Sequence, residues 1–333
     1  MKTVSLAVLL AIAIGCCRAG FASPPGGALD SDRRGDPYSE KPRVIVSTDI
    51  GGSDPDDFQS LVHLLLYTDV IDVEGLISSP PNAGRVRDIR EVIDAYASDY
   101  ARLKRHSNDY PTPNALRVVT KQGAVDKAPH EGWSKPTAGS QWIVQQAQTA
   151  DMRPLWILVW GSITDVAQAV HDEPSIKGKI RVYSIGSWNT KLDSAARDYL
   201  FNKHDDLWWI ESDTTFRGMY MGGMQDGEWG NDRFVQQNVK GHGSLGDLFV
   251  RKKRDIKMGD TPSLLYLLRG NADDPTEPHW GGAFVKTDHG KYFWTDNPDQ
   301  ILSINERAGA KTVSDWRREY LEDWKSRMDR LIE

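Results

Sequence analysis

Four aspartates, Asp49, Asp54, Asp56 and Asp57, lie within the short segment 47–57, which also holds two adjacent glycines. Clustered carboxylate oxygens are the ligands that Ca²⁺ and Mg²⁺ prefer. Part of the cluster has a simpler explanation, because Asp54 and one of its two neighbours can cap the first turn of a helix and stabilise its dipole. Asp49 is not explained in this way, because an unpaired carboxylate at the end of an apolar strand is costly. Residue types alone therefore leave metal binding and helix capping open.

The segments that position these aspartates alternate between two hydrophobic patterns. Short apolar runs typical of buried strands are separated by apolar residues at helical spacing, and this alternation predicts an α/β fold with a mainly parallel, doubly wound sheet. The predicted strands are 43–47, 70–78, 155–160, 181–185 and 207–210, and a C-terminal helix is predicted over 313–332. Ligands of such sheets bind beyond the carboxyl ends of the strands. The aspartate segment directly follows the first predicted strand, as a ligand site requires.

Composition excludes several classes of protein. The chain has 333 residues, of which 39% are hydrophobic, so it can bury a core and is not extensively disordered. Its 47 acidic and 41 basic residues give a net charge of −6 without a basic stripe, so we predict no nucleic-acid partner. The two cysteines are Cys16 and Cys17, which excludes a disulfide scaffold.

The N-terminus has the pattern of a secretory signal peptide over residues 1–22. Lys2 precedes an apolar run that is too short to span a bilayer, and small residues surround a cleavage site before Ser23. The alternative is lipid attachment at Cys16, which follows Gly15 as in a lipoprotein signal. We therefore expect a secreted or periplasmic protein without a transmembrane segment, with a Pro/Gly-rich linker over 23–41 and one domain over 42–333.

Three segments resemble motifs of one enzyme family. Segment 47–57 resembles the acidic signature of inosine–uridine-type nucleoside hydrolases, and its longer spacing is similar to the nucleoside hydrolase-like branch associated with cellulose binding. Segment 158–169, LVWGSITDVAQA, and segment 259–263, GDTPS, are similar to two later motifs of the family and occur in the same order. The resemblance covers about residues 43–300. It implies a sheet of nucleoside-hydrolase type.

The resemblance also implies a calcium site. Asp49 matches the carboxylate that binds Ca²⁺ and accepts the proton of the attacking water, and Asp57 and Asp260 match further ligands. Trp160 occupies the position whose backbone carbonyl binds the metal. Because that ligand belongs to the main chain, the unusual tryptophan is compatible with the site.

Substrate contacts are implied in the same way. Asp56 matches a carboxylate that binds the sugar, and Asn82 aligns with a sugar-binding asparagine, although an ordinary turn explains Asn82 equally well. Gly259 stands where classical members carry the histidine that protonates the leaving base. His279 is a candidate replacement, and the neighbouring Trp280 is a candidate for contact with the ligand or for core packing.

Taken with the resemblance, these residues predict an exported, calcium-dependent hydrolase of N-glycosidic, ribosyl-type bonds. The expected partner is a small nucleoside or carbohydrate, and formation of a homo-oligomer is left open. A carbohydrate-binding protein with the same fold and little hydrolase activity is the alternative, because several tryptophans lie near acidic residues in the second half of the chain.

Overall fold

The computed structural model describes residues 40–80 and 85–333. The predicted signal peptide, most of the predicted linker and Asn82 lie outside the described residues. Within the described part of the chain, no helix has both the length and the apolar character needed to cross a bilayer.

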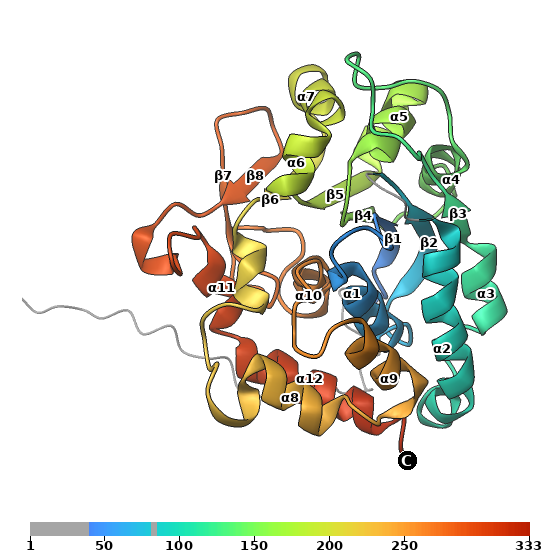
Figure 1. The fold of residues 1–333 in the computed structure, drawn as a ribbon. Helices are drawn as coiled ribbons and strands as arrows, with labels where there is room; N and C mark the ends of the chain where they lie inside the picture. Colours follow the sequence, from blue (N-terminus) through green and yellow to red (C-terminus); the bar gives the residue numbers. More distant parts are fainter. Residues whose placement is uncertain (1–39, 81–84) are drawn as a thin grey trace, which may run out of the picture. The chain divides into compact units, whose positions relative to one another are not determined.

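A single eight-stranded sheet forms the centre of the fold (Figure 1). Its strand order is β3-β2-β1-β4-β5-β6-β8-β7, and every neighbouring pair is parallel except the antiparallel pair of β7 and β8 at one edge. The strands are β1 Arg43–Thr48, β2 Asp72–Ser78, β3 Thr120–Gln122, β4 Leu155–Val159, β5 Ile180–Ile185, β6 Trp208–Ser212, β7 Phe284–Lys286 and β8 Phe293–Asp296. The order places β1 and β4 side by side near the middle of the sheet, so the segments that follow them meet at one edge.

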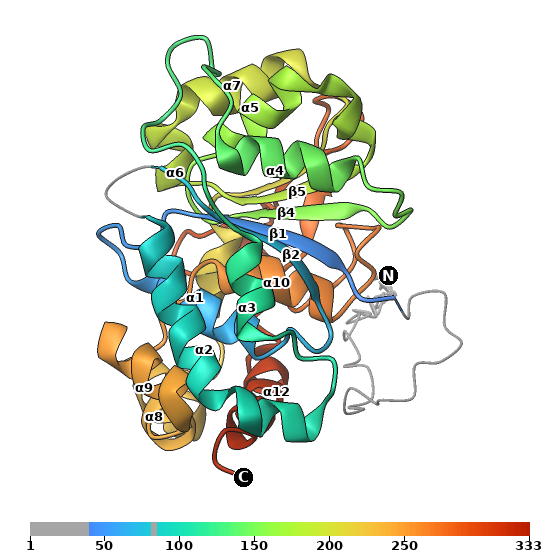
Figure 2. The same ribbon diagram turned by 90° about the vertical axis from the view of Figure 1, so that its right-hand side faces the viewer.

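Helices cover both faces of this sheet, with α4, α5 and α7 on one side and α1, α2, α3 and α10 on the other (Figure 2). The α-helices are α1 Asp56–Leu65, α2 Val86–His106, α3 Pro113–Val118, α4 Ala138–Ala147, α5 Thr164–Asp172, α6 Trp188–Leu192, α7 Ser194–Lys203, α8 Asn231–Asn238, α9 Gly243–Lys252, α10 Thr261–Leu268, α11 Ala310–Ser314 and α12 Arg317–Asp329. Short 3₁₀ helices are η1 Pro174–Gly178, η2 Thr215–Met219, η3 Gly227–Trp229 and η4 Gln300–Leu302.

The core is divided in two by the sheet, because successive side chains of a strand point to opposite faces. In β1, Val44 and Val46 join the cluster of α1, α2 and α12, whereas Ile45 joins the cluster of α4, α5 and α7. All six residues of β1 are buried. A central parallel strand covered on both faces explains why Val44, Ile45 and Val46 are apolar in succession rather than in alternation.

The structure confirms the predicted fold class and each of the five predicted strands. It adds β3, β7 and β8, which have only three or four residues each and lack a clear hydrophobic pattern. The predicted helix over 313–332 is wrong in part, because a break at Asp315 and Trp316 separates α11 from α12. Tyr320, Trp324 and Met328 do form the buried face of α12.

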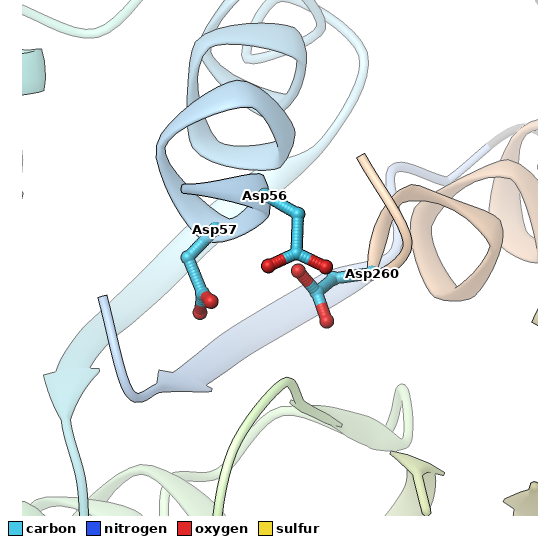
Figure 3. Close-up of side chains that lie close together, drawn as sticks. All are labelled: Asp56, Asp57 and Asp260. Atoms are coloured by element: carbon cyan, nitrogen blue, oxygen red, sulfur yellow. The ribbon is translucent and has the colours of Figure 1, made fainter. Parts of the chain in front are cut away.

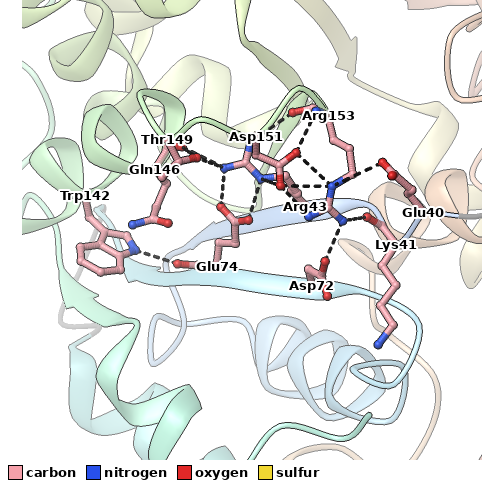
Figure 4. A network of polar contacts seen from close by, with 10 residues as sticks. All are labelled: Glu40, Lys41, Arg43, Asp72, Glu74, Trp142, Gln146, Thr149, Asp151 and Arg153. Carbon is pink, nitrogen blue, oxygen red and sulfur yellow. Dashed lines mark hydrogen bonds and ion pairs between the residues drawn. The ribbon is translucent and has the colours of Figure 1, made fainter.

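A charged network fixes the beginning of β1 at the amino edge of the sheet (Figure 4). The Arg43 side chain is 2% exposed and forms two hydrogen bonds with Glu74 of β2, of 2.6 and 2.8 Å. It also donates to the carbonyls of Gln146 and Arg153, which lie at the end of α4 and before β4. These contacts hold β1 between its neighbours and so fix the place where the strand ends and the aspartate segment begins.

Candidate functional site

Three aspartates from distant parts of the chain meet at the carboxyl end of β1 (Figure 3). Asp56 and Asp57 begin α1, and Asp260 immediately precedes α10. One carboxylate oxygen of each lies within 4.8 Å of those of the other two. Asp57 and Asp260 are each only 3% exposed, so the cluster is largely closed to water.

Asp49 is the first residue after β1 and joins this cluster through Asp57. The two carboxyl groups share a hydrogen bond, and the Thr48 hydroxyl donates a further short hydrogen bond to Asp57. A turn closed by the Gly52 amide and the Asp49 carbonyl, 3.0 Å apart, carries the chain from the strand to α1. The helix N-terminus explains Asp56 and Asp57 in part, but it does not explain a convergence with Asp49 and Asp260.

Burial raises the pKa of every carboxyl in the group. The pKa of Asp49 is raised to about 7, mainly by burial and further by the charge of Asp56, while the hydrogen bond with Asp57 opposes the shift. The pKa values of Asp56, Asp57 and Asp260 lie well above their usual range, first because of burial and then because each carboxylate repels the others. Without a bound cation, these side chains therefore resist full ionisation at neutral pH.

Lys257 is the cation that faces the group from the loop before α10. Its ammonium lies 3.1 Å from Asp54 and 3.9 Å from Asp56. Burial opposes the charge of Lys257, but Asp56 and Asp54 attract the ammonium and raise its pKa. Lys257 pairs directly with Asp54 and Asp56 and acts on Asp260 only from farther away, so one lysine faces a group of several carboxylates.

The donor set fits a hard divalent cation. Oxygen ligands of Ca²⁺ lie 2.3–2.6 Å from the ion, so two of them are at most about 5 Å apart. The oxygens of the aspartate triad satisfy that limit. Ionisation of crowded, buried carboxyl groups is unfavourable, and it becomes favourable when a bound cation supplies the missing positive charge. Asp56, Asp57 and Asp260 could therefore hold one metal ion, with Asp49 adjacent.

Two polar residues of α1 hold Asp260 in place, and sequence reasoning identified neither of them. The Gln59 side chain donates to the carbonyls of Lys253 and Asp255 and accepts from the Lys257 amide, so it fixes the loop before α10. The Ser60 hydroxyl donates to Asp260 Oδ2 at 3.4 Å. Both side chains are completely buried. The signal that could have identified them is their polar character on the buried face of a predicted helix.

Trp160 closes the opposite side of the site, where β4 ends. Its indole nitrogen donates to the Ser263 hydroxyl at 2.8 Å, and that hydroxyl in turn donates to the Asp260 carbonyl. The Trp160 carbonyl, which the resemblance assigns to the metal, accepts a hydrogen bond of 3.2 Å from Asn189 of α6. The tryptophan side chain thus ties β4 to α10 and contributes to the placement of Asp260.

Gly161 allows the end of β4 to approach Asp49. A Cβ atom at this position would lie 2.7 Å from the Cβ and 2.9 Å from the backbone nitrogen of Asp49. We expect Gly161→Ala to cost about 1–3 kcal/mol of unfolding free energy, as overpacking usually does, and to displace Asp49. Denaturant unfolding measures the first effect, and calcium titration measures the second.

Gly178→Ala is the matched control, because a Cβ there meets no atom within 4 Å. This control should change stability by no more than about 0.5 kcal/mol. Equal stability and equal calcium affinity in the two variants would show that Gly161 has no steric role.

The structure places His279 and Trp280 in the core, which for Trp280 is one of the two predicted alternatives. His279 is 1% exposed, stacks on Tyr266 with ring centroids 4.0 Å apart, and has both ring nitrogens within 2.8 Å of backbone carbonyls. Trp280 is 7% exposed and packs in the larger core cluster. Both side chains therefore stabilise the loop between α10 and β7, and neither is available to a ligand.

Gly259 lies directly beside the acidic group. A Cβ atom at this position would be 3.1 Å from Asp56 Oδ2 and 3.4 Å from the Phe216 ring. The position that carries a histidine in classical nucleoside hydrolases thus faces the site, but it supplies no acid here. His279, the proposed replacement, is held in the core.

Comparisons with known proteins agree with this geometry. The family profile described as "Cellulose-binding Sde182, nucleoside hydrolase-like domain" matches residues 43–284. A nucleoside hydrolase-related hypothetical protein from Saccharophagus degradans, associated with carbohydrate metabolism, is 25% identical with a TM-score of 0.70, over 88% of this chain and 72% of that one. No curated protein matches the sequence.

More distant structures share the fold alone. An inosine-guanosine nucleoside hydrolase is 11% identical, with a TM-score of 0.50 over 85% of this chain and 98% of that one. The effector protein XopQ, solved in complex with adenosine diphosphate ribose, is 10% identical, with a TM-score of 0.53 over 88% of this chain and 94% of that one.

Proposed function

This chain belongs to the family of the Sde182 nucleoside hydrolase-like domain, and on that premise we propose that it is an exported, calcium-dependent hydrolase of N-glycosidic, ribosyl-type bonds. The observation that carries the proposal is the convergence of Asp56, Asp57 and Asp260 beside Asp49 at the carboxyl end of β1. Capping of α1 does not account for carboxyl groups that meet there from the end of β1 and from the start of α10.

Each residue has a distinct role in the proposed reaction. Asp57 and Asp260 would hold the metal with Asp49 and the Trp160 carbonyl, as the resemblance implies, and Asp56, whose oxygen lies within 4.8 Å of those of Asp57 and Asp260, would border the same ion. A bound divalent cation would supply the positive charge that polarises water and sugar hydroxyls. Asp49 accepts the proton of the attacking water, as the resemblance implies. Asp56, at the more exposed side of the group, accepts hydrogen bonds from the sugar.

The proposal predicts a strong dependence on the leaving group. Gly259 provides no proton donor and His279 lies in the core, so cleavage should be fastest when the departing group carries negative charge by itself. General acid catalysis is typically worth about 10²–10⁴-fold. We therefore expect nitrophenyl riboside to be cleaved at least about 10²-fold faster than inosine or uridine. Turnover of all three by the purified protein with Ca²⁺ tests this.

Two comparisons make that assay decisive. Asp49→Asn should remove turnover of nitrophenyl riboside, whereas Asp54→Asn, at an exposed position, should retain most of it. Inosine cleaved as fast as nitrophenyl riboside would contradict the missing proton donor. No turnover of any of the three substrates would contradict the hydrolase itself.

The second candidate is a carbohydrate-binding protein with little hydrolase activity. The observation that favours it is Trp188 of α6, which is 67% exposed at the carboxyl edge of the sheet. An exposed indole face beside polar residues is suited to stacking on a sugar ring. Binding of oligosaccharides that is lost in Trp188→Ala, without any release of sugar, would favour this candidate.

A further inference from the structure

Arg217 of η2 is a partly buried guanidinium whose partners are all uncharged. Its two terminal nitrogens donate to the Tyr220 hydroxyl at 3.1 Å and to the Ser187 hydroxyl at 3.0 Å. Its Nε atom is buried and has no hydrogen-bond partner within the described residues. A buried or half-buried charge is normally paired, so this arrangement is incomplete.

Most other sheltered arginines of this chain have carboxylate partners, whereas Arg317, which is 1% exposed, uses all three of its nitrogens to donate to two backbone carbonyls and the Asn231 side chain. Arg43 pairs with Glu74, Arg197 with Glu211 and Arg327 with Asp69. No such ion pair is formed by Arg217 in residues 40–80 and 85–333, although Phe216 packs against its guanidinium at 4.8 Å. Arg217 differs from all of these arginines, because among the described residues it has neither a carboxylate partner nor a hydrogen bond at Nε.

Arg217 borders the acidic site through a short chain of contacts. The Lys257 ammonium lies 4.7 Å from the ring centroid of Tyr220, whose hydroxyl accepts from Arg217. Lys257 in turn lies 3.9 Å from Asp56. The adjacent Phe216 lies against the Cβ position of Gly259, so η2 forms one wall beside the acidic group.

Ser187 completes the same wall from the end of β5. Its backbone is in a strained conformation, with φ 59° and ψ −105°, and its amide donates a short hydrogen bond to Asp213. Such strain persists where the surrounding structure enforces it, frequently at binding sites. Two residues later, Asn189 bonds to the Trp160 carbonyl, so Ser187 is linked to the candidate metal site.

We propose that Arg217 and Ser187 form an anion subsite beside the acidic centre, and that the substrate is a sugar or riboside carrying a phosphate or carboxylate group. This inference rests on the proposed function for the position of the sugar. Guanidinium is suited to such groups, because it directs several donors toward two or three oxygens at once. The unpaired charge of Arg217 also offsets the repulsion that an anionic substrate would meet near four aspartates.

Calorimetric titration of the full chain in calcium tests the subsite without requiring turnover. The probes are ribose 5-phosphate against ribose, and glucuronate against glucose, so the two pairs distinguish phosphate from carboxylate. We expect at least one anionic sugar to bind about tenfold or more tightly than its neutral partner, as expected for one charge-assisted hydrogen bond. Arg217→Met should remove that preference.

Arg254→Met is the matched control, because Arg254 is 73% exposed and pairs with Asp232 outside this wall. Arg217→Lys, which keeps the charge, should retain part of the preference even if Arg217→Met folds poorly. Equal binding of charged and neutral sugars, no binding of any of the four, or an unchanged preference in Arg217→Met would overturn the subsite. A preference without glycoside hydrolysis would support the subsite and reject the hydrolase.

Discussion

Asp49→Asn is expected to reduce turnover of nitrophenyl riboside by more than about 10⁴-fold, beyond the usual effect of losing a general base. Asp49 would serve as both base and metal ligand, and the amide cannot accept the water proton. Its carboxyl already interacts with Asp57 in the metal-free protein, so the substitution also disturbs a second ligand. Single-turnover kinetics at saturating calcium measure the loss.

The same variant should be more stable than the wild type when calcium is absent. Burial and the charge of Asp56 disfavour ionised Asp49, and asparagine removes that charge with little change in shape. Asp54→Asn, the exposed control, should leave metal-free stability nearly unchanged. An Asp49→Asn protein with wild-type turnover would end the proposed mechanism, and one less stable than wild type without metal would show that Asp49 is structural.

Calcium is expected to reverse the dependence of stability on pH. In the metal-free protein, Asp49 has a pKa of about 7 when folded and an ordinary value near 4 when unfolded. Between these values the folded state binds more protons, so stability falls as pH rises, by up to about 1.4 kcal/mol per pH unit for this one group. Below about pH 4, Asp49 is protonated in both the folded and the unfolded state, so its full contribution to stability is present there.

Bound calcium should remove this loss, because ligands must be deprotonated to bind and affinity therefore rises with pH. We expect melting temperatures with calcium and with a chelator to differ little at pH 5 and most at pH 8. Asp57→Asn should abolish the difference, whereas Asp54→Asn should preserve it. Identical melting curves with and without calcium at pH 8 would contradict a metal at this site.

Much of the site could be predicted because its chemistry is local in sequence. A short strand with the apolar run 44–46, followed by Asp49 and then by the acidic start of a helix, identifies both the sheet edge and its charged residues. Asp260 lies far along the chain, and no periodicity connects it to Asp57. Only the resemblance of segment 259–263 to a family motif assigned it to the same place.

The rest depends on packing that sequence patterns do not encode. Pro278, His279 and Trp280 have the composition of an exposed loop, yet only Pro278 is exposed, because the His279 ring packs closely on Gly270 and Trp280 joins the core. Arg217 lies in a short 3₁₀ helix without a pattern, and its significance depends on the partners that it lacks among the described residues. Tertiary contacts decided both cases.

The bond between Ser60 and Asp260 joins positions 200 residues apart, and this separation affects how the protein matures. A chain leaving the ribosome presents Asp49, Asp56 and Asp57 long before Asp260. Contacts between such distant segments form slowly. The nascent chain therefore carries an incomplete set of the proposed ligands for most of its synthesis, and tight binding of the proposed calcium ion would await the arrival of α10. Metal capture would then be a late step that stabilises a nearly finished fold rather than one that begins it.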